Sequence, residues 1–313
     1  MNIVNNKFLF YVSIGLTASG SDGYDHNDAD ISALVKQIHA AKFSDEIKFW
    51  FSRARTGQVE VNPYWPRGSA LAAACFFTDE TYIFKSDLFF DFIENTGVND
   101  PIGAEDFKEW ITELPDILRE IDTKPVTALL WNEYCRIVDN RSPEWHDMIK
   151  KAVNAVEIFF GNNAPEIAFN PNLFTPYSAD FVRIGNRIIT ISYTPDAETM
   201  LHETIHTAVA KYRDKITAYA EAQGLGNFAD KNKMMEFGYM ENESADSAAH
   251  VIEECFVRAI AVTLSGGNDE RLRFHAEYGC NSVPFIASYV RRMKLSFANL
   301  GEFINDVLDK MKT

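Results

Sequence analysis

Apolar residues recur at helical spacing through most of the first half of the chain, where they predict a series of helices. Pro115 lies inside one of these runs and predicts a kink or a break. Ser142 and Pro143 open the last run as a predicted N-cap and first helical residue. The predicted helices cover residues 31–41, 45–55, 69–77, 104–121, 125–138 and 143–160.

The apolar run at residues 8–18 fits two interpretations. It has the length of a signal-peptide core and is followed by a passable cleavage site, but Lys7 is the only basic residue before it. It also fits a strand with Phe8, Phe10 and Val12 on one face, and we prefer this first strand. A cytoplasmic protein is therefore expected, or a secreted or periplasmic one if residues 1–20 are a signal peptide. No later stretch is long enough to span a membrane.

The pattern changes after Gly161 to short β-rich runs. Residues 166–170 alternate, and residues 181–184 and 187–193 flank Gly185-Asn186, a hairpin turn signal. Thr194 and Pro195 then predict the start of a helix. The fold class expected is α+β and mostly helical. Its parts are a helical N-terminal part, residues 1–165 with the initial strand, and a second part, residues 166–313, with a small sheet beside its first helix.

The segment LHETIH in that helix contains the H-E-x-x-H spacing, formed by His202, Glu203 and His206. Residues four apart lie on the same side of a helix, so both imidazoles can bind one Zn²⁺ ion. The glutamate between them can act as general base on the water that the metal activates. The two histidines are offset by about 100° from the apolar stripe through Leu201 and Ile205, which places them at the edge of the buried face.

A catalytic zinc ion needs a third protein ligand, and a later helix offers candidates. A third histidine of the metzincin type is absent, because Tyr212 occupies its place. The segment SADSAAHVIEECFVRAIAVTL carries Glu253 and Glu254 in an apolar run, where acids are costly to bury without a positive partner. A metal ion is one such partner, and Arg258 is the other.

A strand, an H-E-x-x-H helix and a second helix that offers a glutamate resemble the gluzincin metallopeptidases over roughly residues 180–264. The local pattern E-x-x-V-R-A, which begins at Glu254, also resembles other H-E-x-x-H proteins. The resemblance implies a zincin-like core, with His202 and His206 as zinc ligands, Glu254 as the third ligand and Glu203 as the base. Arg258 departs from the family, which often has an acid at that position.

The choice of third ligand stays open between Glu254, Glu253 and His250. We prefer Glu254, because an arginine four residues later can orient it. His250 lies one turn earlier on the same face. His275 could approach the site, and Tyr239, Tyr278 and Tyr289 are candidates for stabilising an oxyanion.

Charge and cysteine content narrow the function classes. The net charge of −15 and the lack of a basic patch disfavour nucleic-acid binding. The four cysteines include no C-x-x-C pair, which disfavours a cysteine-based zinc site. The sequence therefore predicts a zinc metallopeptidase acting on a peptide or protein substrate, with the strand at 187–193 able to pair with an extended peptide. The alternatives are an inactive zincin-like scaffold that binds a protein partner, and a helical module with a chance motif.

Overall fold

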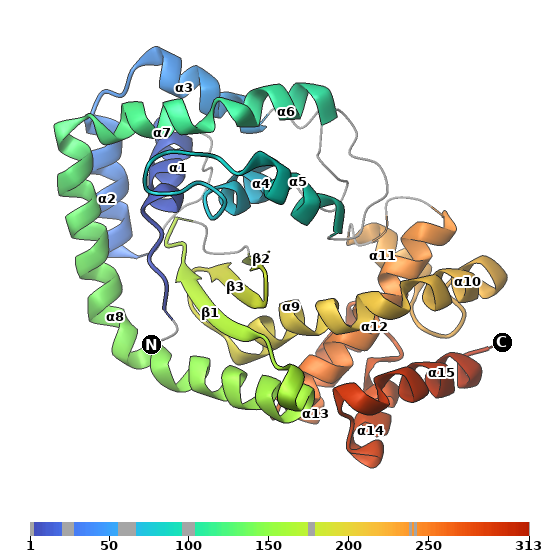
Figure 1. Cartoon of the computed structure of the whole chain (residues 1–313). Helices are drawn as coiled ribbons and strands as arrows, with labels where there is room; N and C mark the ends of the chain where they lie inside the picture. Colours follow the sequence, from blue (N-terminus) through green and yellow to red (C-terminus); the bar gives the residue numbers. More distant parts are fainter. Residues whose placement is uncertain are drawn as a thin grey trace. The chain divides into compact units, whose positions relative to one another are not determined.

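The computed structural model describes residues 3–20, 28–55, 67–95, 104–174, 179–237, 240 and 243–312. These residues are mostly helical and include one small sheet, which confirms the α+β class (Figure 1). They form two compact units. The first comprises Met1–His146 and Ala168–Pro195, and the second comprises Asp147–Ile167 and Asp196–Thr313. The division at residue 165 stays a prediction, and the compact units follow other bounds.

The first unit contains most of the helices that the apolar spacing predicts. The break at Pro115 is confirmed, because one helix ends at Thr112 and the next begins at Leu114 with the proline in its first turn. The helices are α1 (Lys7–Ala18), α2 (Ala29–Ala40), α3 (Asp45–Ser52), η1 (Arg53–Arg55), α4 (Arg67–Ala74), α5 (Ser86–Asn95), α6 (Ala104–Thr112), α7 (Leu114–Asp122) and the first part of α8 (Pro125–Phe160).

The predicted first strand at residues 8–18 is wrong, because this segment forms helix α1. The Asn6 side chain caps it by accepting hydrogen bonds from the amides of Phe8 and Leu9 at 2.9 and 3.2 Å. Nearly every residue from Phe8 to Thr17 is buried. A helix that is covered on all sides has no polar face, so its period of 3.6 residues leaves no trace in the sequence.

The predicted start of a new helix at Ser142 is also wrong, because α8 continues through Pro143. A proline cannot donate to the carbonyl four residues earlier, which here belongs to Asp139. The Ser142 hydroxyl donates to that carbonyl oxygen instead, at 3.1 Å. The serine read as an N-cap therefore compensates for the proline inside a continuous helix.

The sheet has three strands in the order β1-β3-β2, formed by Glu166–Pro171, Arg187–Ser192 and Ala179–Ile184. The predicted hairpin is confirmed, since β2 and β3 pair antiparallel with Ile184 opposite Arg187. Gly185 in the turn has a φ of +59°, which a glycine adopts without strain. The N-terminal segment adds a short parallel bridge from Ile3 to Phe169.

The second unit is helical, and α12 lies at its centre against α9, α10 and α14 (Figure 1). Helix α9 begins two residues later than predicted: Asp196, not Thr194, is its N-cap and accepts a hydrogen bond from the Thr199 amide at 2.8 Å. The elements are η2 (Gly161–Asn163), α9 (Ala197–Val209), η3 (Ala210–Tyr212), α10 (Arg213–Gln223), α11 (Lys231–Glu236), α12 (Ala245–Leu264), α13 (Asp269–Glu277), α14 (Val283–Met293), η4 (Phe297–Asn299) and α15 (Leu300–Lys310).

In the part of the chain that the structure describes, no helix is long and apolar enough to cross a membrane. All four cysteines are free; Cys75, Cys255 and Cys280 are buried, and Cys135 is half-buried.

Candidate metal centre

Helix α9 presents His202 and His206 on one side, one turn apart. Their Nε2 atoms lie 3.1 Å from each other, and the two rings meet edge to face with centroids 4.7 Å apart. About a fifth of each side chain is exposed. The spacing of four residues therefore brings two ring nitrogens to one point at the edge of the buried face.

Glu254 of α12 brings a carboxylate to the same point. Its Oε1 lies 3.0 Å from Nε2 of His206, and its Oε2 lies 3.6 Å from Nε2 of His202. Among the described residues, these three form the one group whose ligand atoms lie within 4.8 Å of one another. Ligand atoms about 2.0–2.1 Å from a tetrahedral zinc ion are about 3.3 Å apart. The measured separations fall around that value, so the donor set fits a small tetrahedral ion with one open position.

Glu253 lies on the opposite side of the His206 ring from Glu254. His206 Nδ1 donates to Glu253 Oε1 at 3.0 Å, and Arg213 donates to Glu253 Oε2 at 3.2–3.3 Å. Burial raises the pKa of Glu253, but the hydrogen bond from His206 and the charge of Arg213 outweigh it and lower that pKa. A carboxylate in this position fixes the tautomer and the orientation of a ligating histidine.

Arg258 holds Glu254 in the way that the sequence suggests. Its Nε and Nη2 donate to Oε2 of Glu254 at 2.9 and 2.8 Å. Burial raises the pKa of Glu254, while Arg258 and the two histidines lower it well below its usual value, so the carboxylate is ionised. Oε1 thus remains directed at His206.

The two histidines differ in their protonation. Burial lowers the pKa of His202 to about 3, although Glu254 opposes this shift, so the ring is neutral. Burial also lowers the pKa of His206, but Glu253 and Glu254 raise it well above 6.5. Without a metal ion, His206 therefore carries a second proton between two carboxylates. A metal cation at the same point can replace that proton, because it too presents positive charge to the surrounding lone pairs.

The other predicted residues lie near or outside this group. Glu203 is half-buried on α9, between the two histidines in the sequence. His250 is half-buried one turn before Glu254 on α12 and is not a member of the group. Tyr278 is half exposed and contacts the ring of Phe274 at 4.5 Å.

The other two tyrosine candidates are Tyr239 and Tyr289. Tyr239 lies outside the described residues. Tyr289 is buried against Phe285, with the Arg292 guanidinium 3.8 Å from its ring centroid.

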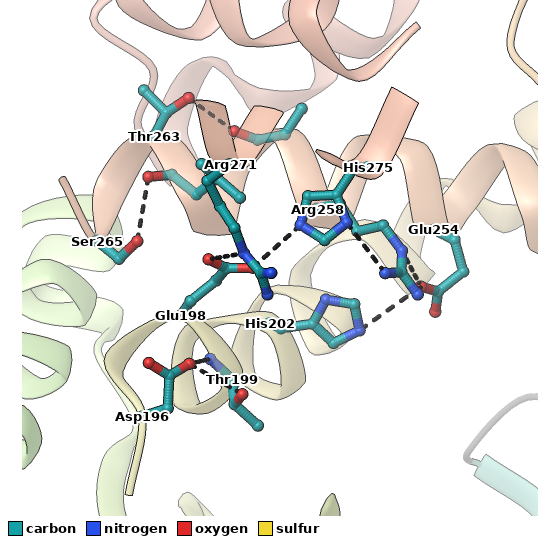
Figure 2. A network of polar contacts seen from close by, with 12 residues as sticks. Asp196, Glu198, Thr199, His202, Glu254, Arg258, Thr263, Ser265, Arg271 and His275 are labelled. Atoms are coloured by element: carbon teal, nitrogen blue, oxygen red, sulfur yellow. Dashed lines mark hydrogen bonds and ion pairs between the residues drawn. The ribbon is translucent and has the colours of Figure 1, made fainter. Parts of the chain in front are cut away.

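A chain of polar contacts leads from Glu254 through α13 back to α9 (Figure 2). Arg258 Nη1 donates to Nδ1 of His275 at 3.3 Å, and His275 Nε2 donates to Glu198 at 3.1 Å. Arg271 also donates to Glu198, at 2.9 Å. Three residues of these contacts, Glu198, Arg271 and Arg213, are not among the predicted site residues. One signal was available for Glu198, which precedes His202 by four residues and so shares its side of α9.

Comparisons with protein-family models, with curated proteins and with solved structures find no match for this chain.

Proposed function

We propose that the chain is a zinc-dependent hydrolase of peptide bonds with a zincin-like core similar to that of the gluzincins. His202, His206 and Glu254 would hold the ion, and Glu203 would be the general base. The observation that carries this proposal is the convergence of three ligand atoms from α9 and α12 within 4.8 Å. Two imidazoles and one carboxylate with an open fourth position are a common donor set for catalytic zinc.

The surroundings of the ligands support a metal centre. Glu253 holds the proton of His206 on Nδ1, which leaves Nε2 available as a metal ligand. Arg258 engages one oxygen of Glu254 and leaves the other available. Two of the three proposed ligands, His206 and Glu254, thus have an outer partner that orients them.

Zinc, when bound, lowers the pKa of a coordinated water molecule to about 7. Glu203 would accept the proton of the attacking water and deliver it to the leaving amine. Its place next to His202 on the helix is the position that this role requires. The Glu203 side chain is half-buried, so part of it is exposed to solvent.

The competing interpretation is a polar network without a metal. Arg258 and Arg213 already compensate the charges of Glu254 and Glu253, so burial alone does not demand a metal ion. This interpretation predicts no zinc uptake. An inactive scaffold that binds a protein partner predicts zinc uptake without hydrolysis.

The decisive experiment measures zinc and hydrolysis on the same preparation. The chain is stripped with a chelator, reloaded with zinc, and analysed for zinc content and for cleavage of a quenched fluorescent peptide library. We expect about one zinc per chain, lost in His202→Ala, and cleavage that disappears after chelation. Failure to bind zinc would refute the proposal, and zinc binding without cleavage would leave only the scaffold.

A further inference from the structure

Four side chains, joined by three contacts, connect the two ligand-bearing helices around one side of the candidate centre. The path runs from Glu254 to Arg258 on α12, to His275 on α13, and to Glu198 on α9, one turn before His202 (Figure 2). The contacts measure 2.9, 3.3 and 3.1 Å in that order. The path ends at Glu198, and His202, one turn further along α9, lies 3.6 Å from Glu254, so the path closes a ring through helices α9, α12 and α13.

His275 occupies the middle of this ring and is 4% exposed. Arginine can only donate, so Nδ1 of His275 must accept the hydrogen bond from Arg258. Its Nε2 then carries the proton and donates to Glu198. One imidazole thus connects a cation on α12 to an anion on α9, with each ring nitrogen in the role that its partner requires.

The partners of His275 are themselves fixed. Arg258 contacts Glu254 with Nε and Nη2 and His275 with Nη1, so its planar guanidinium is held on two edges. Glu198 accepts hydrogen bonds from Arg271 and from His275. Burial raises the pKa of Glu198, but these two contacts outweigh it and lower the pKa to about 2. Neither partner of His275 can rotate without breaking a second charged contact.

We propose that His275 is a positioning residue that sets the placement of Glu254 against His202 and thereby the affinity of the centre for zinc. The inference rests on the proposed zinc site and extends it to a residue that contacts no ligand atom. Glu254 Oε2, the oxygen that Arg258 holds, lies 3.6 Å from His202 Nε2, whereas Oε1 lies 3.0 Å from His206 Nε2. The path of contacts through α9, α12 and α13 controls the separation between His202 and Glu254. The orientation of His206 is held separately by Glu253.

The test compares His275→Leu with His275→Gln in the full chain. Glutamine can accept from Arg258 through its oxygen and donate to Glu198 through its nitrogen, whereas leucine can do neither. Zinc affinity is measured by competition with a chromophoric chelator, and the cobalt-substituted protein is examined for its visible absorption. Tyr219→Phe serves as the matched control, because it removes a buried hydrogen bond to Met311 in the same unit.

We expect His275→Leu to bind zinc about tenfold more weakly and to show a changed cobalt spectrum. His275→Gln should restore both, and Tyr219→Phe should lower the urea midpoint of the chelated protein without changing zinc affinity. If His275→Leu does not fold, Glu198→Ala opens the ring on the α9 side and should weaken zinc binding in the same direction.

Unchanged zinc affinity in folded His275→Leu or folded Glu198→Ala would overturn the inference. So would a loss of zinc affinity in His275→Gln equal to that in His275→Leu. These results leave the proposed zinc site intact. A wild-type chain that takes up no zinc would overturn both.

Discussion

Glu253 and Glu254, two consecutive residues of α12, contact the two different nitrogens of His206. Glu253 accepts from Nδ1 at 3.0 Å, and Glu254 lies 3.0 Å from Nε2. Consecutive side chains on a helix diverge by about 100°, so they can reach around one imidazole from its two sides. The arrangement gives the two acids different roles, one behind the ring and one at the point where the ligand atoms meet.

Glu254→Ala should therefore abolish zinc binding, whereas Glu253→Ala should weaken it by about 10–100-fold. The first change removes a ligand atom. The second removes the group that orients His206 and leaves Arg213, which is partly exposed, to the solvent. Equilibrium dialysis against buffered zinc measures the zinc affinity of the two variants. The reverse order of effects would make Glu253 the ligand and would contradict the assignment.

Glu203→Gln should retain about one zinc and reduce peptide hydrolysis by about 10²–10⁴-fold. The amide has the shape of the carboxylate but cannot accept a proton from water. Turnover of a fluorescent peptide library is compared with that of Glu221→Gln, an exposed position on α10. Undiminished turnover in Glu203→Gln would exclude it as the base.

The features that local chemistry determines could be predicted from the sequence. The pair Gly185-Asn186 predicted the hairpin, because the turn needs a positive φ, which glycine adopts. The side-by-side placement of His202 and His206 follows from helical spacing alone. The pairing of Glu254 with Arg258 follows from the same geometry.

The features that depend on tertiary structure could not be predicted from the sequence. Helix α1 looked like a strand because its surroundings bury both faces, and α8 looked like two helices because the compensating Ser142 resembles a cap. The contact between Glu198 and His275 joins residues 77 positions apart. No spacing rule connects such residues, and the choice between Glu253 and Glu254 likewise needs the position of His206.

Glu198→Gln should make the stability of the metal-free protein less dependent on acid. The pKa of Glu198 in the folded chain, about 2, lies below its ordinary value of 4.5 because His275 and Arg271 outweigh burial. Its ionised form therefore stabilises the fold above about pH 4.5, and this contribution is lost as the pH falls from there towards 2.

The free energy of unfolding of the wild type should exceed that of Glu198→Gln by on the order of 2 kcal/mol at pH 7. This difference should shrink between about pH 5 and pH 3. Urea unfolding in the presence of a chelator measures it. Glu270→Gln changes the charge equally at an exposed position of α13 and should show no such trend. A difference independent of pH would mean that Glu198 acts through its shape alone.

Gly15→Ala should destabilise the first unit, because α1 packs against α3 at this residue. A Cβ on Gly15 would overlap Cε2 of Phe51, which leaves no room for a methyl group. Overpacking of this kind costs about 1–3 kcal/mol, although alanine favours a helix over glycine by about 1 kcal/mol. In a Phe51→Ala background the ring is absent, and the same change should become neutral or stabilising. Urea unfolding of the four proteins gives the coupling between the two sites. An equal cost in both backgrounds would show that the two residues are not in contact and would reopen the assignment of residues 7–18 as a packed helix.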